Sequence, residues 1–178
     1  MKQAFLKRQT GMTLLEVTAS LAIGTIIIMG ALALFGGGSA AANSNAFIQN
    51  ITSLRSAVKS LYLGQGNYGT ASINGTLINS SKVPADWTGS GTTITNNFGG
   101  AVVITGATST FNLTTGAIPK DVCIGALPSA AKGWSFVGVG ADAAAALTAA
   151  TITPASMTPA QATTSCSATT QFIAFIGS

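Results

Sequence analysis

The chain contains no histidine, and only 7% of its 178 residues are charged. Without histidine, and with just four acidic residues, it lacks the usual groups of acid–base and nucleophilic catalysis and the usual ligands of zinc. Intrinsic disorder requires low hydrophobicity, whereas 47% of these residues are hydrophobic. A surface built from serine, threonine, asparagine and glycine repels copies of itself only weakly. The composition therefore favours a folded protein that packs against itself, with no catalytic site, metal or cofactor.

Positive charge is unevenly placed along the chain. Three of the eight basic residues, Lys2, Lys7 and Arg8, precede Met12, and a long apolar run follows. A basic stretch before such a run stays on the cytoplasmic side of the membrane under the positive-inside rule. The remaining basic residues form no patch with interleaved aromatic residues, so no nucleic-acid partner is predicted.

The acidic residues are scattered. Asp86, Asp121 and Asp142 are far apart in the sequence, whereas a calcium site needs clustered oxygen ligands. The stretch GVGADA, residues 138–143, superficially matches a dinucleotide-binding fingerprint. Such a site expects an acid about 20 residues further on, and no acid follows Asp142. We interpret the stretch as a tight strand-to-helix turn, with Asp142 capping a short helix that ends near Ala150.

Only two cysteines are present, Cys123 and Cys166, and both follow the apolar run. In an exported chain such a pair more often forms a disulfide than a metal site. Closing that loop of about 44 residues would stabilise the fold by roughly 4 kcal/mol on the chain-entropy model.

Residues 12–35 form an apolar run of about 24 residues, which at roughly 36 Å is long enough to cross a membrane. Glu16 lies inside it, although an acid in such a segment is rare without a partner or a function. A secretory signal peptide, cut near Ala40 or Ala42, and a plain single-span anchor are the simpler alternatives. The length of the run argues against the first, and Glu16 argues against both.

Glycines interrupt the run and follow it. Gly24, Gly30 and the triplet at 36–38 fit helix packing through small residues in a membrane, or a segment that unwinds when the chain leaves the bilayer. The triplet is the better candidate for unwinding, since three glycines cost a helix about 3 kcal/mol relative to alanine. If the triplet stays helical, one helix runs from Met12 to Leu63.

Beyond the glycines the pattern predicts an α+β fold. An apolar stripe at steps of three and four residues indicates an amphipathic helix up to Gly64; its members are Phe47, Ile51, Leu54, Val58 and Leu61. Short runs between turn residues predict strands at 92–95, 101–105, 109–114, 134–139 and 171–176. A short helix is expected in which Pro119 occupies the first turn, and a long ordered loop is expected at 151–170.

The stretch KRQTGMTLLEV, residues 7–17, resembles the processing signal of type IV pilins. In that family a short basic leader ends in glycine, an apolar residue follows the cut, and glutamate is the fifth residue of the mature chain. The resemblance implies cleavage between Gly11 and Met12 by a prepilin peptidase, N-methylation of Met12, and a role for Glu16 in assembly. The Glu16 carboxylate would neutralise the Met12 amine of a neighbouring subunit, a pairing that fixes register more than it adds stability.

Further short stretches of the sequence resemble the type IVb pilins. A methionine after the cut is similar to toxin-coregulated pilus and thin-pilus subunits, and YGT, KVPADW, NNFGG and IPKDVC are similar to the plasmid and enteric thin-pilus group. The resemblance implies a long N-terminal helix packed on an antiparallel sheet, with Cys123 and Cys166 paired to clamp the C-terminal region. It divides the chain into a leader at 1–11, a transmembrane and fibre-core helix at 12–38, and a head at 39–178 that begins with the amphipathic helix 39–64.

The expected function is that of a structural subunit and not of an enzyme. The precursor would lie in the bacterial inner membrane with its head in the periplasm. It would meet the prepilin peptidase and the inner-membrane assembly platform, and then polymerise with itself into an extracellular type IV pilus. A type II secretion pseudopilin or a minor pilin is the alternative with the same architecture. A membrane-anchored periplasmic binding protein is the alternative from another class.

Overall fold

A computed structural model describes residues 13–150 and 157–178, apart from the side chains of residues 33–37. It divides the chain into two compact units, Met1–Ser39 and Ala40–Ser178. Helix α1, Leu14–Leu61, contributes to both units. Its backbone remains helical through residues 36–38, while the predicted start at Met12 lies outside the described residues.

Both ends of α1 have a local cause. At the start, the carbonyl of Thr13 accepts the backbone N–H of Glu16 at 3.0 Å and that of Val17 at 3.2 Å. At the other end, α1 stops two residues before the predicted Leu63. Gly64 has a φ of +83°, a left-handed conformation that glycine adopts without a steric penalty and that commonly closes a helix.

Six antiparallel strands form one sheet in the second unit, in the order β1-β2-β3-β4-β6-β5. The strands are β1 Thr88–Ser90, β2 Thr93–Thr95, β3 Ala101–Ala107, β4 Thr110–Pro119, β5 Phe136–Gly140 and β6 Thr170–Gly177. Five of them confirm the predicted strands, although β4 continues as far as Pro119. Strand β1 was not predicted, because a three-residue exposed strand with a central glycine carries no apolar alternation.

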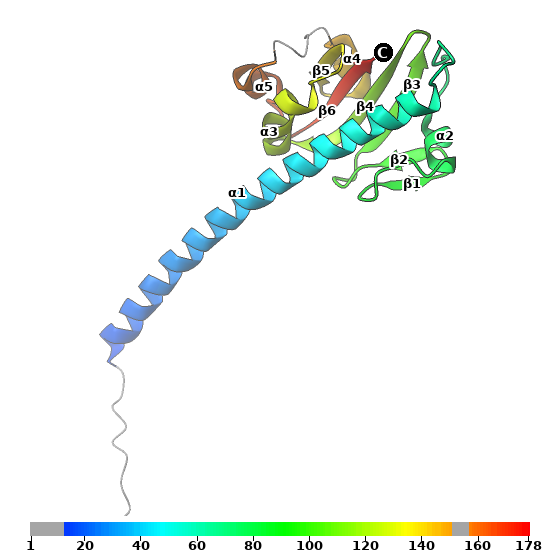
Figure 1. The fold of residues 1–178 in the computed structure, drawn as a ribbon. Helices are drawn as coiled ribbons and strands as arrows, with labels where there is room; N and C mark the ends of the chain where they lie inside the picture. The colour runs from blue at the N-terminus through cyan, green and yellow to red at the C-terminus, as the bar shows by residue number, and fades with distance from the viewer. Residues whose placement is uncertain (1–12, 151–156) are drawn as a thin grey trace, which may run out of the picture. The chain divides into compact units, whose positions relative to one another are not determined.

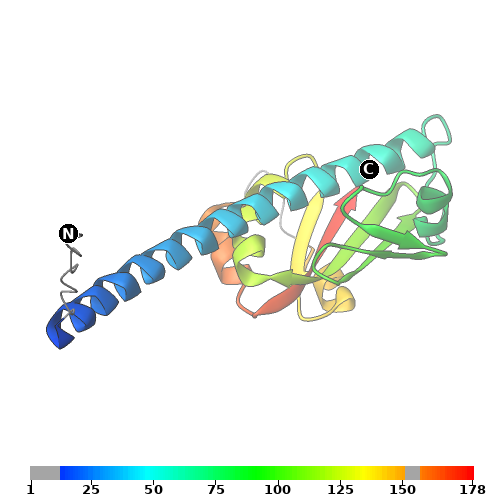
Figure 2. The ribbon, with the colours of Figure 1, turned by 90° about the horizontal axis from the view of Figure 1, so that it is seen from below.

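The core of the second unit lies between α1 and one face of this sheet, which α1 crosses in both ribbon views (Figures 1 and 2). The predicted stripe of α1 supplies one side of it: Phe47, Ile51, Leu54 and Val58 are fully buried, and Leu61 is partly buried. Alternate residues of the strands supply the other side, among them Ile104, Leu113, Val137, Ile173 and Phe175. The helical period of 3.6 residues and the strand period of 2 residues therefore bring apolar side chains from both kinds of element into one layer.

A second layer covers the opposite face of the sheet. Along β5, Gly138 and Gly140 alternate with the buried Val137, and a Cβ added at either glycine would overlap the backbone of α4, Ala143–Thr148. The turn between them is the strand-to-helix turn predicted for GVGADA. Asp142 caps α4, since its carboxylate accepts the backbone N–H of Ala145 at 2.8 Å. The two glycines therefore serve close helix–strand packing.

Two further short helices belong to the second unit: α3 follows β4 in the chain, and α2 precedes β1. Helix α3, Lys120–Ala130, confirms the predicted helix, although Pro119 is extended and directly precedes the first helical residue. Helix α2, Asn74–Asn79, was not predicted, because its Asn-Gly pair is a turn signal. Ile73 and Leu77, four residues apart and both buried, anchor α2 to the core instead.

The loop predicted for 151–170 is wrong in its second half, where the chain forms helix α5, Pro159–Ser165. Thr158 and Gln161 make a capping box, and Pro159 occupies the first helical position, so three local signals start the helix together. Residues 151–156 lie outside the described part of the chain.

Candidate functional site

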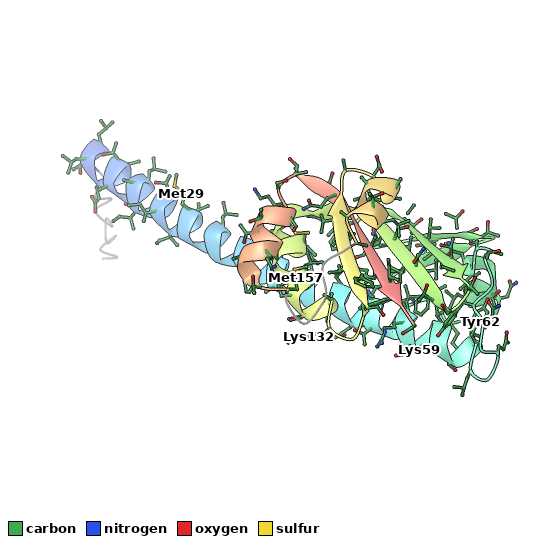
Figure 3. All side chains as sticks on the ribbon, turned by 90° about the horizontal axis from the view of Figure 1, so that it is seen from above. Met29, Lys59, Tyr62, Lys132 and Met157 are labelled. Carbon is green, nitrogen blue, oxygen red and sulfur yellow. A yellow bond between two sulfur atoms is a disulfide. The ribbon has the colours of Figure 1, made fainter. Side chains whose placement is uncertain are left out.

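The first unit presents an apolar helix that the protein itself does not cover. Its segment Leu14–Leu32 has a mean hydropathy of 1.9 and is 0% buried, and it is long and apolar enough to cross a membrane. Figure 3 shows Met29 and neighbouring side chains projecting from several sides of the helix. The exposed large apolar residues are Leu14, Leu15, Val17, Leu21, Ile23, Ile26, Ile27, Ile28, Met29 and Leu32. A helix that is apolar all round requires a membrane or copies of itself as its surroundings.

Polar side chains within this segment are satisfied by their own helix. The hydroxyls of Thr18, Ser20 and Thr25 donate to backbone carbonyls three or four residues earlier, at 3.0, 2.7 and 2.8 Å. Such internal hydrogen bonds allow a hydroxyl to sit in an apolar medium. The Glu16 carboxylate differs, because it has no hydrogen bond or ion pair with any residue that the structure describes.

Glu16 lies in the first turn of α1 and is exposed. A negative charge is favourable there, since the unpaired backbone N–H groups of a helix N-terminus carry partial positive charge. No residue that the structure describes supplies a full counter-charge. Gly11 and Met12, the predicted cleavage pair, lie outside the described residues, so their roles stay predictions.

The two cysteines of the second unit form a disulfide, as the sequence predicts. Cys123 lies in α3 and Cys166 follows the last residue of α5; their Cα atoms are 6.0 Å apart and both side chains are fully buried. The bond joins positions separated by 43 residues. It fixes α5 beside α3 (Figure 1) and so holds the C-terminal part of the chain that leads into β6.

A row of aromatic rings lies between α1 and the sheet, and sequence reasoning missed it. Its members contact one another at tilted or edge-to-face angles, with neighbouring ring centroids 5.1 to 5.5 Å apart, in the order Tyr62, Tyr68, Phe111, Trp134 and Phe175. These spacings are typical of attractive aromatic pairs. Their positions are distant in the chain, so no local pattern could have indicated the row.

Two features of α1 lie on opposite flanks of its part in the second unit. On one flank, the Arg55 guanidinium lies over the Trp134 ring, with its Cζ atom 5.6 Å from the ring centroid. On the other flank is a groove of about 510 Å³ between α1 and the chain that leads to β1. Its lining consists of Ser53, Ser56, Ala57, Ser60, Ser81, Lys82, Val83, Pro84 and Ala85. No group of three or more metal-ligating side chains occurs within residues 13–150 and 157–178.

Comparison with known proteins relates the chain to one family and to solved structures of pilins. The family model described as PilS N terminal matches residues 41–178. The type IVb pilin from Salmonella typhi has 21% sequence identity and a TM-score of 0.57, over 72% of this chain and 95% of that one. TcpA, a type IV pilin from the El Tor biotype of Vibrio cholerae, has 23% identity and a TM-score of 0.53, over 76% of this chain and 99% of that one. No curated protein matches the chain.

Proposed function

Because the chain belongs to the PilS N-terminal family and has the fold of type IVb pilins, we propose that it polymerises into a type IV pilus after a prepilin peptidase cuts between Gly11 and Met12. It is a pilus subunit and a structural protein, not an enzyme. One observation carries the proposal: Leu14–Leu32 is apolar, has no buried residue and carries a single acid in its first turn.

That segment suits two surroundings in succession. Before assembly it spans the inner membrane, with the basic leader in the cytoplasm and the head in the periplasm. After cleavage, and with the help of the inner-membrane assembly platform, it packs against the same segment of neighbouring copies in the core of the fibre. Each surrounding removes the exposed apolar side chains from water, which is the main driving force in both.

Glu16 supplies the specificity of this assembly. Cleavage creates an α-amine at Met12, which the peptidase then methylates, and the Glu16 carboxylate of a neighbouring copy pairs with that amine. A carboxylate in hydrocarbon costs several kcal/mol on most scales, so a copy placed without this pairing is disfavoured. The pairing sets the axial register of each added subunit.

The test replaces Glu16 with alanine in the full-length precursor. Glu16→Ala should be inserted and cleaved like the wild type, yet the filaments sheared from cells should fall below detection. Ser20→Ala is the matched control, since Ser20 lies one turn further on and its hydroxyl bonds only to the backbone carbonyl of Glu16. Normal filaments from Glu16→Ala would refute the assembly role. Mass spectrometry of sheared wild-type fibres should find methylated Met12 at the N-terminus, and a chain that retains Lys2 would refute the processing step.

A further inference from the structure

Arg55 is a cation that has no ion pair with any residue that the structure describes. Its side chain is half-buried, its guanidinium lies over Trp134, and its Nη1 atom packs against Gly133. The Nε atom is buried and has no hydrogen-bond partner within the described residues. Removing a guanidinium from water without an anion is unfavourable, because its lost hydration is not replaced.

Two lysines extend this positive region, which we call the basic flank and define as Arg55, Lys59 and Lys132. Lys59 follows Arg55 by one helical turn, and Lys132 precedes Gly133, against which Arg55 packs. Figure 3 shows Lys59 and Lys132 on the α1 side of the second unit. Within residues 13–150 and 157–178, none of the three has an ion pair. The flank thus holds three of the five basic residues that follow Met12.

One of the three acids of the second unit is equally uncompensated. Asp142 caps α4, and Asp121 lies in the first turn of α3, where the helix N-terminus favours a negative charge. Asp86 belongs to no helix, is exposed, and has no hydrogen bond or ion pair among the described residues. It lies in a tight turn in which the Trp87 N–H donates to the Pro84 carbonyl at 3.0 Å. The Trp87 side chain is 5% exposed, so the turn is anchored in the core and presents Asp86 at a fixed place.

The basic flank and Asp86 cannot meet within one copy. Arg55 faces Gly133, whereas Ala57, about 200° away around the helix, lines the groove next to Asp86. Figure 1 accordingly shows α3 on one side of this part of α1 and β1 with β2 on the other. A contact between two different faces of identical copies is heterologous, and it continues from copy to copy into a filament when the rotation does not close a ring.

We propose that the Arg55 guanidinium and the Lys59 ammonium of one copy contact the Asp86 carboxylate of the next copy, a contact that rests on the proposed polymerisation. The groove beside Asp86 receives the Lys59 stem, and its serine hydroxyls give that stem a polar wall. Lys82 also lines this groove and repels the incoming cations. It therefore weakens the contact, and Lys82→Gln should increase the fraction of subunits found in filaments.

Charge reversal in the full-length chain tests the pairing. Asp86→Lys and Lys59→Glu should each lower the ratio of sheared filaments to cell-bound subunit by at least about tenfold, since like charges that face each other at an interface are strongly unfavourable. The double variant Lys59→Glu with Asp86→Lys should restore that ratio to within about threefold of the wild type, because it exchanges the partners and keeps the pair. Lys59 is preferred to Arg55 for reversal because the Arg55 guanidinium lies over the Trp134 ring.

Controls separate this contact from folding and from the wider proposal. Cleavage of the leader and formation of the disulfide should be unchanged in every variant. Asp121→Lys, the same change at an acid already compensated by a helix, should leave the filament ratio near that of the wild type. Rescue of Lys59→Glu by Asp121→Lys instead of Asp86→Lys would overturn the pairing. A filament ratio near that of the wild type in both single-reversal variants would overturn it too. This holds even if the reversals abolish binding of the filaments to heparin, because the charges would then serve an outside ligand and not the contact between copies. A wild type that is cleaved but never forms filaments would overturn the proposed function as well.

Discussion

Asn96 offers the most specific test of how the head is built. Its side chain is 4% exposed, and its Nδ2 atom donates to the Gly116 carbonyl at 2.8 Å and to the Thr115 hydroxyl at 2.9 Å. Its Oδ1 atom accepts the backbone N–H of Phe98 at 2.9 Å and of Gly100 at 2.8 Å. All four hydrogen-bonding positions of the amide are used inside the protein.

These bonds hold an irregularity in the sheet. The register between β4 and β6 shifts after Thr115, next to Gly116 and to Ala117, which has a φ of +55°. A Cβ added at Gly100 would overlap the carbonyl of Gly116, so the two backbones approach closely at this bulge. Asn96 joins the loop before β3 to the bulge in β4, and it keeps both in place.

Asn96→Ala removes every one of these bonds. Two backbone N–H groups and one carbonyl lose their partner, and each buried unsatisfied group costs about 1–3 kcal/mol. Since water can enter the space left by the amide and offset part of this loss, we expect the free energy of unfolding to fall by about 3–5 kcal/mol. Asn97→Ala is the matched control: the neighbouring asparagine is exposed, and the change should cost less than about 0.5 kcal/mol.

Urea unfolding of the full-length chain in detergent measures this difference. Trp87 and Trp134 are both buried, so their fluorescence reports on the head and not on the apolar helix. The midpoint should shift for Asn96→Ala with an unchanged slope, which identifies a change in stability and not in the surface exposed on unfolding. A loss below about 1 kcal/mol would show that the bulge does not depend on this amide.

Two further predictions use the same unfolding measurement. Replacing both Cys123 and Cys166 with alanine should lower the free energy of unfolding by about 4 kcal/mol, which is the loop-closure value for their separation of 43 residues. A loss below about 1 kcal/mol would mean that the unfolded chain is already restricted without the disulfide. Gly138→Ala should destabilise the head by about 3 kcal/mol or more, because the new methyl group overlaps the backbone of Ala146 and Ala150. Gly75→Ala is its control, since the added Cβ lies an ordinary 3.6 Å from Thr92 and alanine should stabilise α2 by up to about 1 kcal/mol. Equal effects of the two changes would contradict the close packing of α4 on β5.

The sequence predicts those parts of the fold that repeat a simple period. The stripe from Phe47 to Val58 is fully buried because a helix brings every third or fourth residue to one side, whatever it packs against. Strand β3 was predicted for a similar reason, since its buried residues alternate. Helix α2 could not be predicted, because an Asn-Gly pair favours a turn until tertiary burial of Ile73 and Leu77 overrides it.

The candidate site divides in the same way. The exposed apolar run and Glu16 can be recognised from the order of residues in one short segment, because a membrane-length segment with one acid is unusual in any context. The basic flank could not be predicted. Arg55 and Lys59 are helical neighbours, but Lys132 and Trp134 join them only through the path of the chain across the sheet. Contacts between distant positions leave no local pattern in a single sequence.

Scarcity of charge has a consequence for how identical subunits find one register. In the proposed filament, apolar packing between copies of Leu14–Leu32 would be strong but non-directional, so it would supply cohesion without choosing an axial position. On a highly charged surface many exposed pairs, each worth about 0–1 kcal/mol, would let shifted positions compete. This head has three acids, and two of them are already engaged at helix N-termini. A neighbouring copy therefore meets one uncompensated carboxylate, Asp86, just as the apolar unit presents one acid, Glu16. In the filament that we propose, a shift by a single position would leave both carboxylates unpaired, so two isolated charges would specify a register that many charges would leave ambiguous.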